Sequence, residues 1–179
     1  MRLLHNAFQY DAWATDRLLT VTALLDETQL NQKVDGMFGS TLDTWRHQIQ
    51  VSYVYHRMIF GGLPEREFAA APLPELVEVA ATLGPLYDEA TTNLGEGELQ
   101  RKFNVPWFER DFSVEDGLFQ VITHSIEHRA DIASALSRFG LETPPIDYVM
   151  WWYLSGPEQR FWRRRPGVRG RGESPVGPR

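Results

Sequence analysis

The chain has 179 residues and a formal net charge of −6 at pH 7, and 42% of its residues are hydrophobic. A chain of this length can bury a core as one domain without covalent staples. It contains no cysteine, which excludes disulfides, thiolate metal ligands and a cysteine nucleophile, so any metal must be held by nitrogen or oxygen. The N-terminus lacks the unbroken apolar stretch of a signal peptide, and no segment approaches the roughly 18 apolar residues of a membrane helix. We therefore expect a soluble, cytoplasmic protein.

Charge is distributed unevenly along the chain. Residues 1–159 carry 11 Lys and Arg against 23 Asp and Glu, whereas residues 160–179 carry seven Arg against Glu173. An acidic domain is unsuited to nucleic acid, because binding of phosphates requires a basic face. Only the tail is expected to attract nucleic acid, weakly and without sequence specificity.

Two segments in the first third of the chain have the apolar spacing of amphipathic helices. The first covers residues 2–25, where the apolar positions recur mostly on one face. After a polar stretch, Ser40 precedes a second helix, with Asp43 three residues later as a carboxylate variant of the capping box. We expect this helix to end near Phe60, before a Gly-Gly pair.

A third helix is predicted from about Pro72 to Leu94. Gly84-Pro85 inside it predicts a kink or a break. The next segment, residues 95–112, has alternating aromatic positions, a proline and two glycines but no helical period. We expect an extended crossover or a short hairpin there.

A fourth helix is predicted after Ser113, with Asp116 at the capping-box position, and it ends at Gly140. Residues 146–161 are rich in Trp and Tyr. We expect a short helix there that packs its aromatic side chains on the rest of the domain.

Four long amphipathic segments without a strand-rich block predict an all-α protein, a four-helix bundle with a crossover connection. The bundle is expected to occupy residues 1–160. Residues 161–179 are rich in Arg, Gly and Pro, a composition typical of a disordered tail.

His124 and His128 lie four residues apart in the fourth predicted helix. At this spacing two imidazoles project from one face, one turn apart, and can bind the same metal ion. Val121 and Ile132 lie on much the same side, which indicates that this face points into the bundle. Taken alone, such a pair is a weak motif, because histidines at this spacing also occur on helix surfaces.

A site with an open coordination position usually has three protein ligands. The candidates for the third are His5, His47 and His56. His47 and His56 are nine residues apart and fall on opposite faces of the second helix at about 100 degrees per residue, so only one of them can point at the core. Val51 and Val54 share the face of His47. This favours His47, although periodicity alone leaves His56 open.

Three segments resemble the DinB-like metal-binding family. The most specific is HSIEHRADIASALSRFGLETPPIDYVMW, from His124 to Trp151, where a helix with His-x-x-x-His-Arg leads through a Leu-x-x-x-Gly turn to Pro-Pro and an aromatic segment. The N-terminal HNAFQYDAWATDRLL and the second-helix segment WRHQIQVSYVYHRMIFG are similar to the family as well. The resemblance covers about residues 1–155.

The resemblance implies an up-down-down-up four-helix bundle with a divalent metal, zinc or nickel, on His47, His124 and His128. It also implies a homodimer and a metal-dependent enzyme of the thiol transferase or isomerase type, which uses a low-molecular-weight thiol against small electrophiles. The alternatives are a metal-dependent hydrolase and a non-enzymatic, stress-related dimer that binds a metal or a ligand. Arg129 follows the second ligand as in the family pattern, and a structural salt bridge is its expected role.

Residues for the chemistry itself are harder to assign. Ser125 stands where the glutamate of a His-Glu-x-x-His metalloprotease would be, which disfavours that hydrolytic mechanism. Glu127 and Asp131 are the candidate catalytic residues, to orient an imidazole or act as a base, although charged residues are mostly solvated. Phe103 and Trp107 are the candidates for contacting a small molecule, because irregular segments often carry binding residues.

Overall fold

The computed structural model describes residues 2–155, so the tail predicted at 161–179 and the end of the aromatic segment lie outside the described residues. Four long helices form the body of this part of the chain: α1 (Arg2–Thr22), α3 (Thr41–Phe60), α4 (Leu73–Thr92) and α6 (Val114–Arg138). The shorter elements are α2 (Glu27–Asn31), α5 (Glu96–Gln100), β1 (Lys102–Val105), the 3-10 turn η1 (Pro106–Phe108), β2 (Arg110–Ser113) and α7 (Tyr148–Ser155). The predicted all-α four-helix bundle is confirmed. Of the short helices, α2 and α5 had no signal in the apolar pattern.

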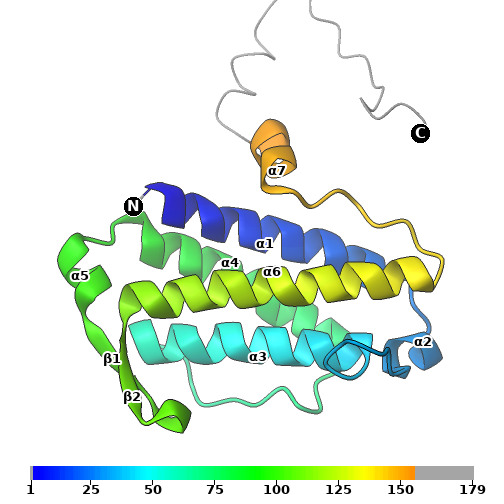
Figure 1. Cartoon of the computed structure of the whole chain (residues 1–179), viewed down its shortest axis with the longest axis horizontal. Coiled ribbons are helices and arrows are strands. Elements are labelled where there is room, and N and C mark those ends of the chain that lie inside the picture. The colour runs from blue at the N-terminus through cyan, green and yellow to red at the C-terminus, as the bar shows by residue number, and fades with distance from the viewer. Residues whose placement is uncertain (1, 156–179) are drawn as a thin grey trace, which may run out of the picture.

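The path of the chain through the bundle is up-down-down-up. α1 and α6 run in one direction and α3 and α4 in the other (Figure 1). Each helix packs on two neighbours: α1 on α4 and α6, and α3 on the same two helices. Because α3 and α4 run the same way, residues 61–72 return along the length of the bundle, and this connection is the long crossover (Figure 1). None of the helices within residues 2–155 is both long and apolar enough to span a bilayer.

The two helices that carry the candidate ligands begin at the predicted capping boxes. At the start of α3, Asp43 N–H donates to Ser40 Oγ at 3.1 Å and Ser40 N–H donates to Asp43 Oδ2 at 3.2 Å. At the start of α6, Asp116 N–H donates to Ser113 Oγ and Ser113 N–H donates to Asp116 Oδ2, both at 3.1 Å. These bonds satisfy N–H groups that a helix start leaves without partners, and they fix where each helix begins.

The α4 helix continues through Gly84 and Pro85, so of the two predicted outcomes, a kink or a break, the break is absent. Gly84 lies against α1, where a Cβ at this position would be 3.1 Å from Cβ of Ala12. Close packing on α1 holds α4 together although Pro85 cannot donate a backbone hydrogen bond.

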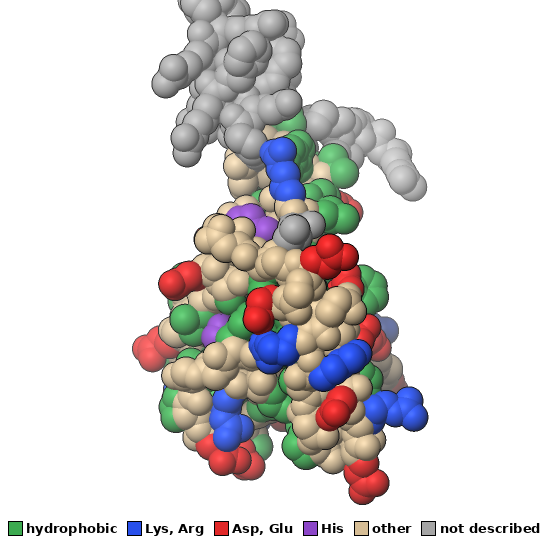
Figure 2. All heavy atoms as spheres, turned by 90° about the vertical axis from the view of Figure 1, so that its left-hand side faces the viewer, with side chains coloured by type: hydrophobic (Ala, Val, Ile, Leu, Met, Phe, Trp, Pro, Cys, Tyr) green, Lys and Arg blue, Asp and Glu red, His purple; other side chains and the backbone are tan. Residues whose placement is uncertain are grey.

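Residues 95–112 contain the hairpin that was one of the two predicted forms. β1 and β2 pair antiparallel, with Lys102 opposite Ser113 and Val105 opposite Arg110. The hairpin and α5 cover one end of the bundle (Figure 1). Figure 2 views the molecule from this end. Acidic and basic side chains are interspersed on the surface that it shows, without a large patch of one sign.

The short C-terminal helix packs aromatic side chains on the bundle, as predicted for this segment. Tyr10 of α1 donates from its hydroxyl to the carbonyl of Ile146 at 2.8 Å. Its ring lies 5.5 Å from that of Tyr148 and 6.3 Å from that of Trp151, between centroids. α7 therefore packs on α1, at a distance from the hairpin.

Candidate metal site

Three histidines converge between α3 and α6. Nε2 of His124 lies 3.0 Å from Nε2 of His47 and 3.1 Å from Nε2 of His128, and the potential ligand atoms of the three residues all lie within 4.8 Å of one another. An imidazole nitrogen carries either one proton or one lone pair, so Nε2 of His124 cannot form good hydrogen bonds to both neighbours. A cation between the three atoms accounts for both short distances, because tetrahedral coordination at about 2.0–2.1 Å separates ligand nitrogens by roughly 3.3 Å.

The electrostatics of the cluster keep imidazoles in the form that binds a metal. Burial, and then the charge of His128, lower the pKa of His47. Burial, and then the charges of His128 and His47, lower the pKa of His124 to about 4. Both residues are therefore neutral at pH 7, as a histidine ligand must be.

The two candidate catalytic carboxylates have different surroundings. Asp131 Oδ2 lies 3.7 Å from Nδ1 of His128, the ring atom that points away from the Nε2 cluster. Nδ1 of both His124 and His128 is buried and has no hydrogen-bond partner within residues 2–155. A ligating histidine usually donates its second N–H to an acceptor, and Asp131 is the carboxylate next to Nδ1 of His128, although the two form no hydrogen bond. Glu127 is exposed and forms no hydrogen bond or ion pair with another described residue.

The other two histidines of the described chain lie elsewhere. His56 is 5% exposed, and its ring packs 5.0 Å from that of Tyr87. His5 lies with Nδ1 3.2 Å from the hydroxyl of Thr91. The structure thus brings His47 to the α6 pair and leaves His56 on another face of α3.

A pocket of about 510 Å³ opens beside His47, and we refer to it as the histidine pocket. It is formed mainly by α3 and the loop before it, and its lining is Lys33, Phe38, Gly39, Asp43, Arg46, His47, Gln50 and Ala69. The Phe38 ring is 53% exposed and stacks on the His47 imidazole, 4.1 Å between centroids. A pocket of this size accepts a small molecule. The pocket was not predicted, because Phe38 in a mostly polar stretch is a weak sequence signal.

The two hairpin residues predicted to contact a small molecule do not line the histidine pocket. Phe103 is 7% exposed and packs against Tyr55, 6.2 Å between ring centroids. Trp107 is 57% exposed and lies 6.4 Å from the same tyrosine ring. A separate pocket of about 550 Å³ lies there, lined by Tyr55, Phe108, Phe112, Asp116, Gly117 and Gln120. Neither Phe103 nor Trp107 is part of the lining of this hairpin pocket, so their small-molecule role stays a prediction.

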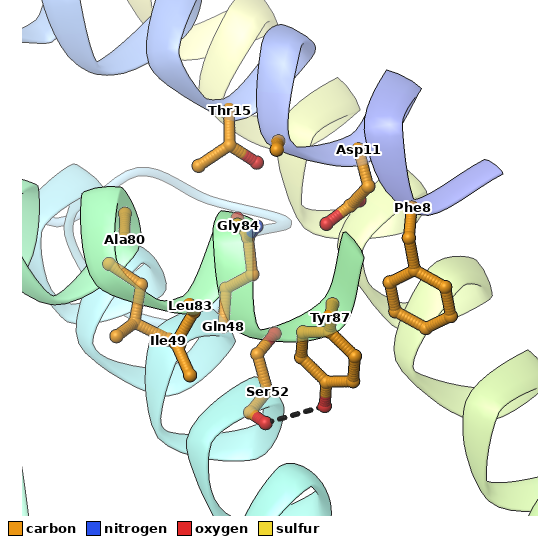
Figure 3. Close-up of a pocket in the computed structure, with 11 residues that line it drawn as sticks. Phe8, Asp11, Thr15, Gln48, Ile49, Ser52, Ala80, Leu83, Gly84 and Tyr87 are labelled. Carbon is orange, nitrogen blue, oxygen red and sulfur yellow. Dashed lines mark hydrogen bonds between the residues drawn. The ribbon is translucent and has the colours of Figure 1, made fainter. Parts of the chain in front are cut away.

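A third cavity lies inside the bundle, between α1, α3 and α4 (Figure 3). Asp11 and Thr15 of α1 and Gln48 of α3 contribute its polar groups, and Tyr87 donates from its hydroxyl to the Ser52 carbonyl at 2.7 Å. The cavity measures about 30 Å³, which is about the volume of one water molecule in the liquid. It is therefore too small to be a substrate site.

Arg129, next to the second histidine of α6, forms the expected structural salt bridge. It is 1% exposed and pairs with the carboxylate of Asp11 on α1. It also donates to the hydroxyl of Thr15 at 3.1 Å, and its guanidinium lies 5.4 Å from the centre of the Tyr10 ring. These contacts hold α6 against α1 at the residue that follows the ligand His128.

Comparison with known proteins agrees with this arrangement. Residues 1–160 match the DinB family. Among solved structures, the chain is similar to YfiT from Bacillus subtilis, which is described as a probable metal-dependent hydrolase with an unusual four-helix bundle topology. That similarity has a TM-score of 0.59 at 18% sequence identity and covers 76% of this chain and 87% of YfiT, so it shows the fold alone. No curated protein matches the chain.

Proposed function

The chain belongs to the DinB family, and from this premise we propose that it is a metal-dependent enzyme that holds one divalent ion, zinc or nickel, on His47, His124 and His128. The observation that carries the proposal is the convergence of three Nε2 atoms, with separations of 3.0 and 3.1 Å at His124. Three protein ligands leave one position for water or substrate, which is typical of catalytic rather than structural zinc sites. When bound, such an ion supplies Lewis acidity that turns water or a thiol into a nucleophile at neutral pH.

Hydrolysis of a small molecule is the first candidate reaction. The description of YfiT as a probable metal-dependent hydrolase supports it. In this reaction we assign Asp131 to orientation of His128 through Nδ1, from which it lies 3.7 Å away. Glu127 is assigned as the general base, a role for which its exposed side chain must turn toward the substrate.

Transfer of a low-molecular-weight thiol to a small electrophile is the second candidate, and the position of the carboxylates favours it. Within residues 2–155, the cluster of potential ligands around the Nε2 atoms contains no carboxylate. A thiol needs less help from a protein base than water does, because coordination to a metal deprotonates a thiol outright. The chain contains no cysteine, so the thiol would be a separate small molecule.

The metal site is tested by measuring bound metal in the purified protein after reconstitution with zinc or nickel. We expect one ion per chain in the wild type and none after His47→Ala, His124→Ala or His128→Ala. The matched controls are His5→Ala and His56→Ala, which remove histidines that lie outside the cluster. A reconstituted wild type that holds no metal would overturn the proposal.

The two reactions are separated by their need for thiol. Hydrolysis of an activated ester should proceed without thiol, whereas conjugation of a small electrophile should require it. In either case activity should follow the metal content of the histidine variants. Activity that survives in a metal-free His124→Ala protein would show that the histidine cluster is not the active site.

We also propose a homodimer, as the family resemblance implies. Phe119 and Ile126 of α6 are 65% and 46% exposed, and their spacing of seven residues places them on one helix face, away from the histidines. A second copy of the chain packed on this face would cover both side chains. Light scattering should then give twice the mass of the chain for the wild type and the mass of a single chain for Phe119→Glu. Leu24→Glu is the control, because Leu24 is 70% exposed on another part of the surface, and this variant should remain a dimer.

A further inference from the structure

The loop before α3 places Lys33 and Phe38 on the lining of the histidine pocket. Lys33 and Ser40 form an isolated antiparallel bridge, which closes the loop. Thr44 donates from its hydroxyl to the carbonyl of Phe38 at 3.2 Å. Gly39 has a φ of 78°, and a Cβ there would lie 2.8 Å from the carboxylate that caps α3. The loop is therefore packed against the start of the helix, with Lys33 and Phe38 both on the pocket lining.

The charges on the lining do not cancel. Asp43 accepts hydrogen bonds from Arg46 Nη1 at 3.1 Å and from the Ser40 N–H at 3.2 Å. Arg46 also donates from Nε to the carbonyl of Ala71 at 2.8 Å. These two residues satisfy each other. The side chain of Lys33 is exposed and forms no hydrogen bond or ion pair with the other described residues, so its ammonium group is the uncompensated charge of the pocket.

The apolar part of the pocket has a definite shape. The Phe38 ring lies nearly parallel to the His47 imidazole, with an angle of 17° between the planes, and it is 53% exposed. A half-exposed aromatic ring offers a flat surface for a second flat group. The pocket therefore combines one positive charge with one flat apolar wall.

We propose that the histidine pocket selects small molecules that carry a carboxylate joined to a flat apolar group. Lys33 binds the carboxylate and Phe38 contacts the apolar group. A single ammonium suits a singly charged group, whereas phosphates are usually held by several donors. The proposal names the substrate class of the enzyme and rests on the proposed function in that respect, but binding to the pocket can be measured without any reaction.

The first test compares benzoate with benzamide, which have nearly the same shape and differ in charge. Calorimetric titration of the metal-loaded wild type should show binding of benzoate and about three- to tenfold weaker binding of benzamide. Lys33→Gln should weaken benzoate binding by a similar factor and leave benzamide binding unchanged. Lys102→Gln is the matched control, since Lys102 lies on β1 and is the only other lysine of the chain.

The second test reads the lysine directly. Reductive dimethylation with a 13C label keeps the charge of lysine, and the two lysines give two side-chain signals that the variants assign. Benzoate should shift the signal of Lys33 and leave that of Lys102 in place. Equal binding of benzoate and benzamide, no binding of either, or equal effects of Lys33→Gln and Lys102→Gln would each overturn the proposal.

A third arm separates this proposal from the metal site. In His124→Ala the preference for benzoate over benzamide should persist, because it originates from Lys33. A preference that disappears with His124 but survives Lys33→Gln would assign the anion site to the metal and overturn the role of Lys33. A wild type without hydrolase or transferase activity that still prefers benzoate through Lys33 would sink the proposed function and leave the pocket assignment standing.

Discussion

The histidine region and the hairpin end of the α3–α6 pair differ in how closely side chains pack on the helices and in which polar atoms are buried there. At the hairpin end, Phe103 and Ile59 pack so closely over Gly117 that a Cβ there would lie 2.6 Å from the phenylalanine ring. Near the histidines, by contrast, Oε1 of Gln48 and Oγ of Ser125 are buried without a hydrogen-bond partner within the described residues. Orphaned polar atoms lower stability. Close packing on a glycine thus marks the hairpin end, next to the hairpin pocket, whereas unpartnered polar atoms lie beside two of the histidines.

The largest effect on stability is expected from loss of Arg129, which ties the α6 helix to α1 next to the histidine cluster. Arg129→Met leaves the Asp11 carboxylate, 15% exposed, without its partner. Loss of one partner of a buried ion pair should lower the free energy of unfolding by about 3–5 kcal/mol, measured by urea denaturation. Arg138→Met, an exposed position at the end of the same helix, should change it by less than about 0.5 kcal/mol. Equal effects of the two variants would contradict the structural role of the buried pair.

Metal binding should raise the free energy of unfolding through the histidine region, and a change in the hairpin region should not alter this gain. At a free zinc concentration about 100 times the Kd, binding adds about 2.7 kcal/mol to the free energy of unfolding. This increment should vanish in His128→Ala and persist in Gly117→Ala, as measured by denaturation with and without zinc. An increment that persists in His128→Ala would place the bound ion elsewhere.

The hairpin end should respond to a single added methyl group. Gly117→Ala places Cβ within 3 Å of both Phe103 and Ile59. Overpacking should outweigh the gain in helix propensity and destabilise the protein by about 2 kcal/mol. Gly97→Ala, in α5, meets nothing within 4 Å and serves as the control. Its stability should equal or slightly exceed that of the wild type.

Acid should weaken the metal-free histidine region. The pKa of His124 falls from the ordinary 6.5 to about 4 on folding, so the unfolded chain binds more protons between these values. Stability is therefore fully present above pH 6.5 and is lost as the pH falls toward 4, by about 1–2 kcal/mol for this partly exposed residue. Denaturation in the presence of a chelator should show this slope, and His124→Gln should flatten it. A slope that is unchanged in His124→Gln would assign the proton uptake to other groups.

The smallest effect is expected at the tip of the hairpin. Trp107 is 57% exposed, so Trp107→Ala should change the free energy of unfolding by no more than about 0.5 kcal/mol and leave metal content unchanged. A larger loss of stability would show that the tip belongs to the core. A loss of bound metal in Trp107→Ala would show that the hairpin tip affects the histidine site, contrary to the separation seen in the structure.

The sequence predicted the long helices because their signals are local. The serine and aspartate at the starts of α3 and α6 satisfy backbone groups within one turn, and the apolar period sets which face is buried. The same period favoured His47 over His56, and the structure does bring His47 to the α6 pair. The reason was wrong, however, because His56 is the histidine that points into the core, at 5% exposed, whereas His47 is half-buried. Of the kink or break predicted at Gly84-Pro85, the break is absent, and the contact of Gly84 with Ala12 of α1 is a tertiary effect that the local sequence does not show.

The histidine pocket could not be predicted because its parts meet only in the folded chain. The stacking of Phe38 on His47 depends on a bridge between Lys33 and Ser40, which closes a loop without a strand pattern. In the same way, the burial of Phe103 depends on the absence of a side chain at Gly117. Binding residues often lie in irregular segments, and this rule led to the hairpin residues Phe103 and Trp107. The irregular segment that reaches the histidines is instead the loop before α3.

The large sequence separation between the candidate ligands has a consequence for the order of events during synthesis in the cell. His47 and His124 are separated by 77 residues, and the last ligand lies near the end of the bundle. A growing polypeptide that has emerged only through α4 contains only one residue of the histidine cluster, His47, and so lacks the complete site. Such non-local contacts form late in folding. The proposed ion can therefore be held by all three ligands only after α6 has docked on α3.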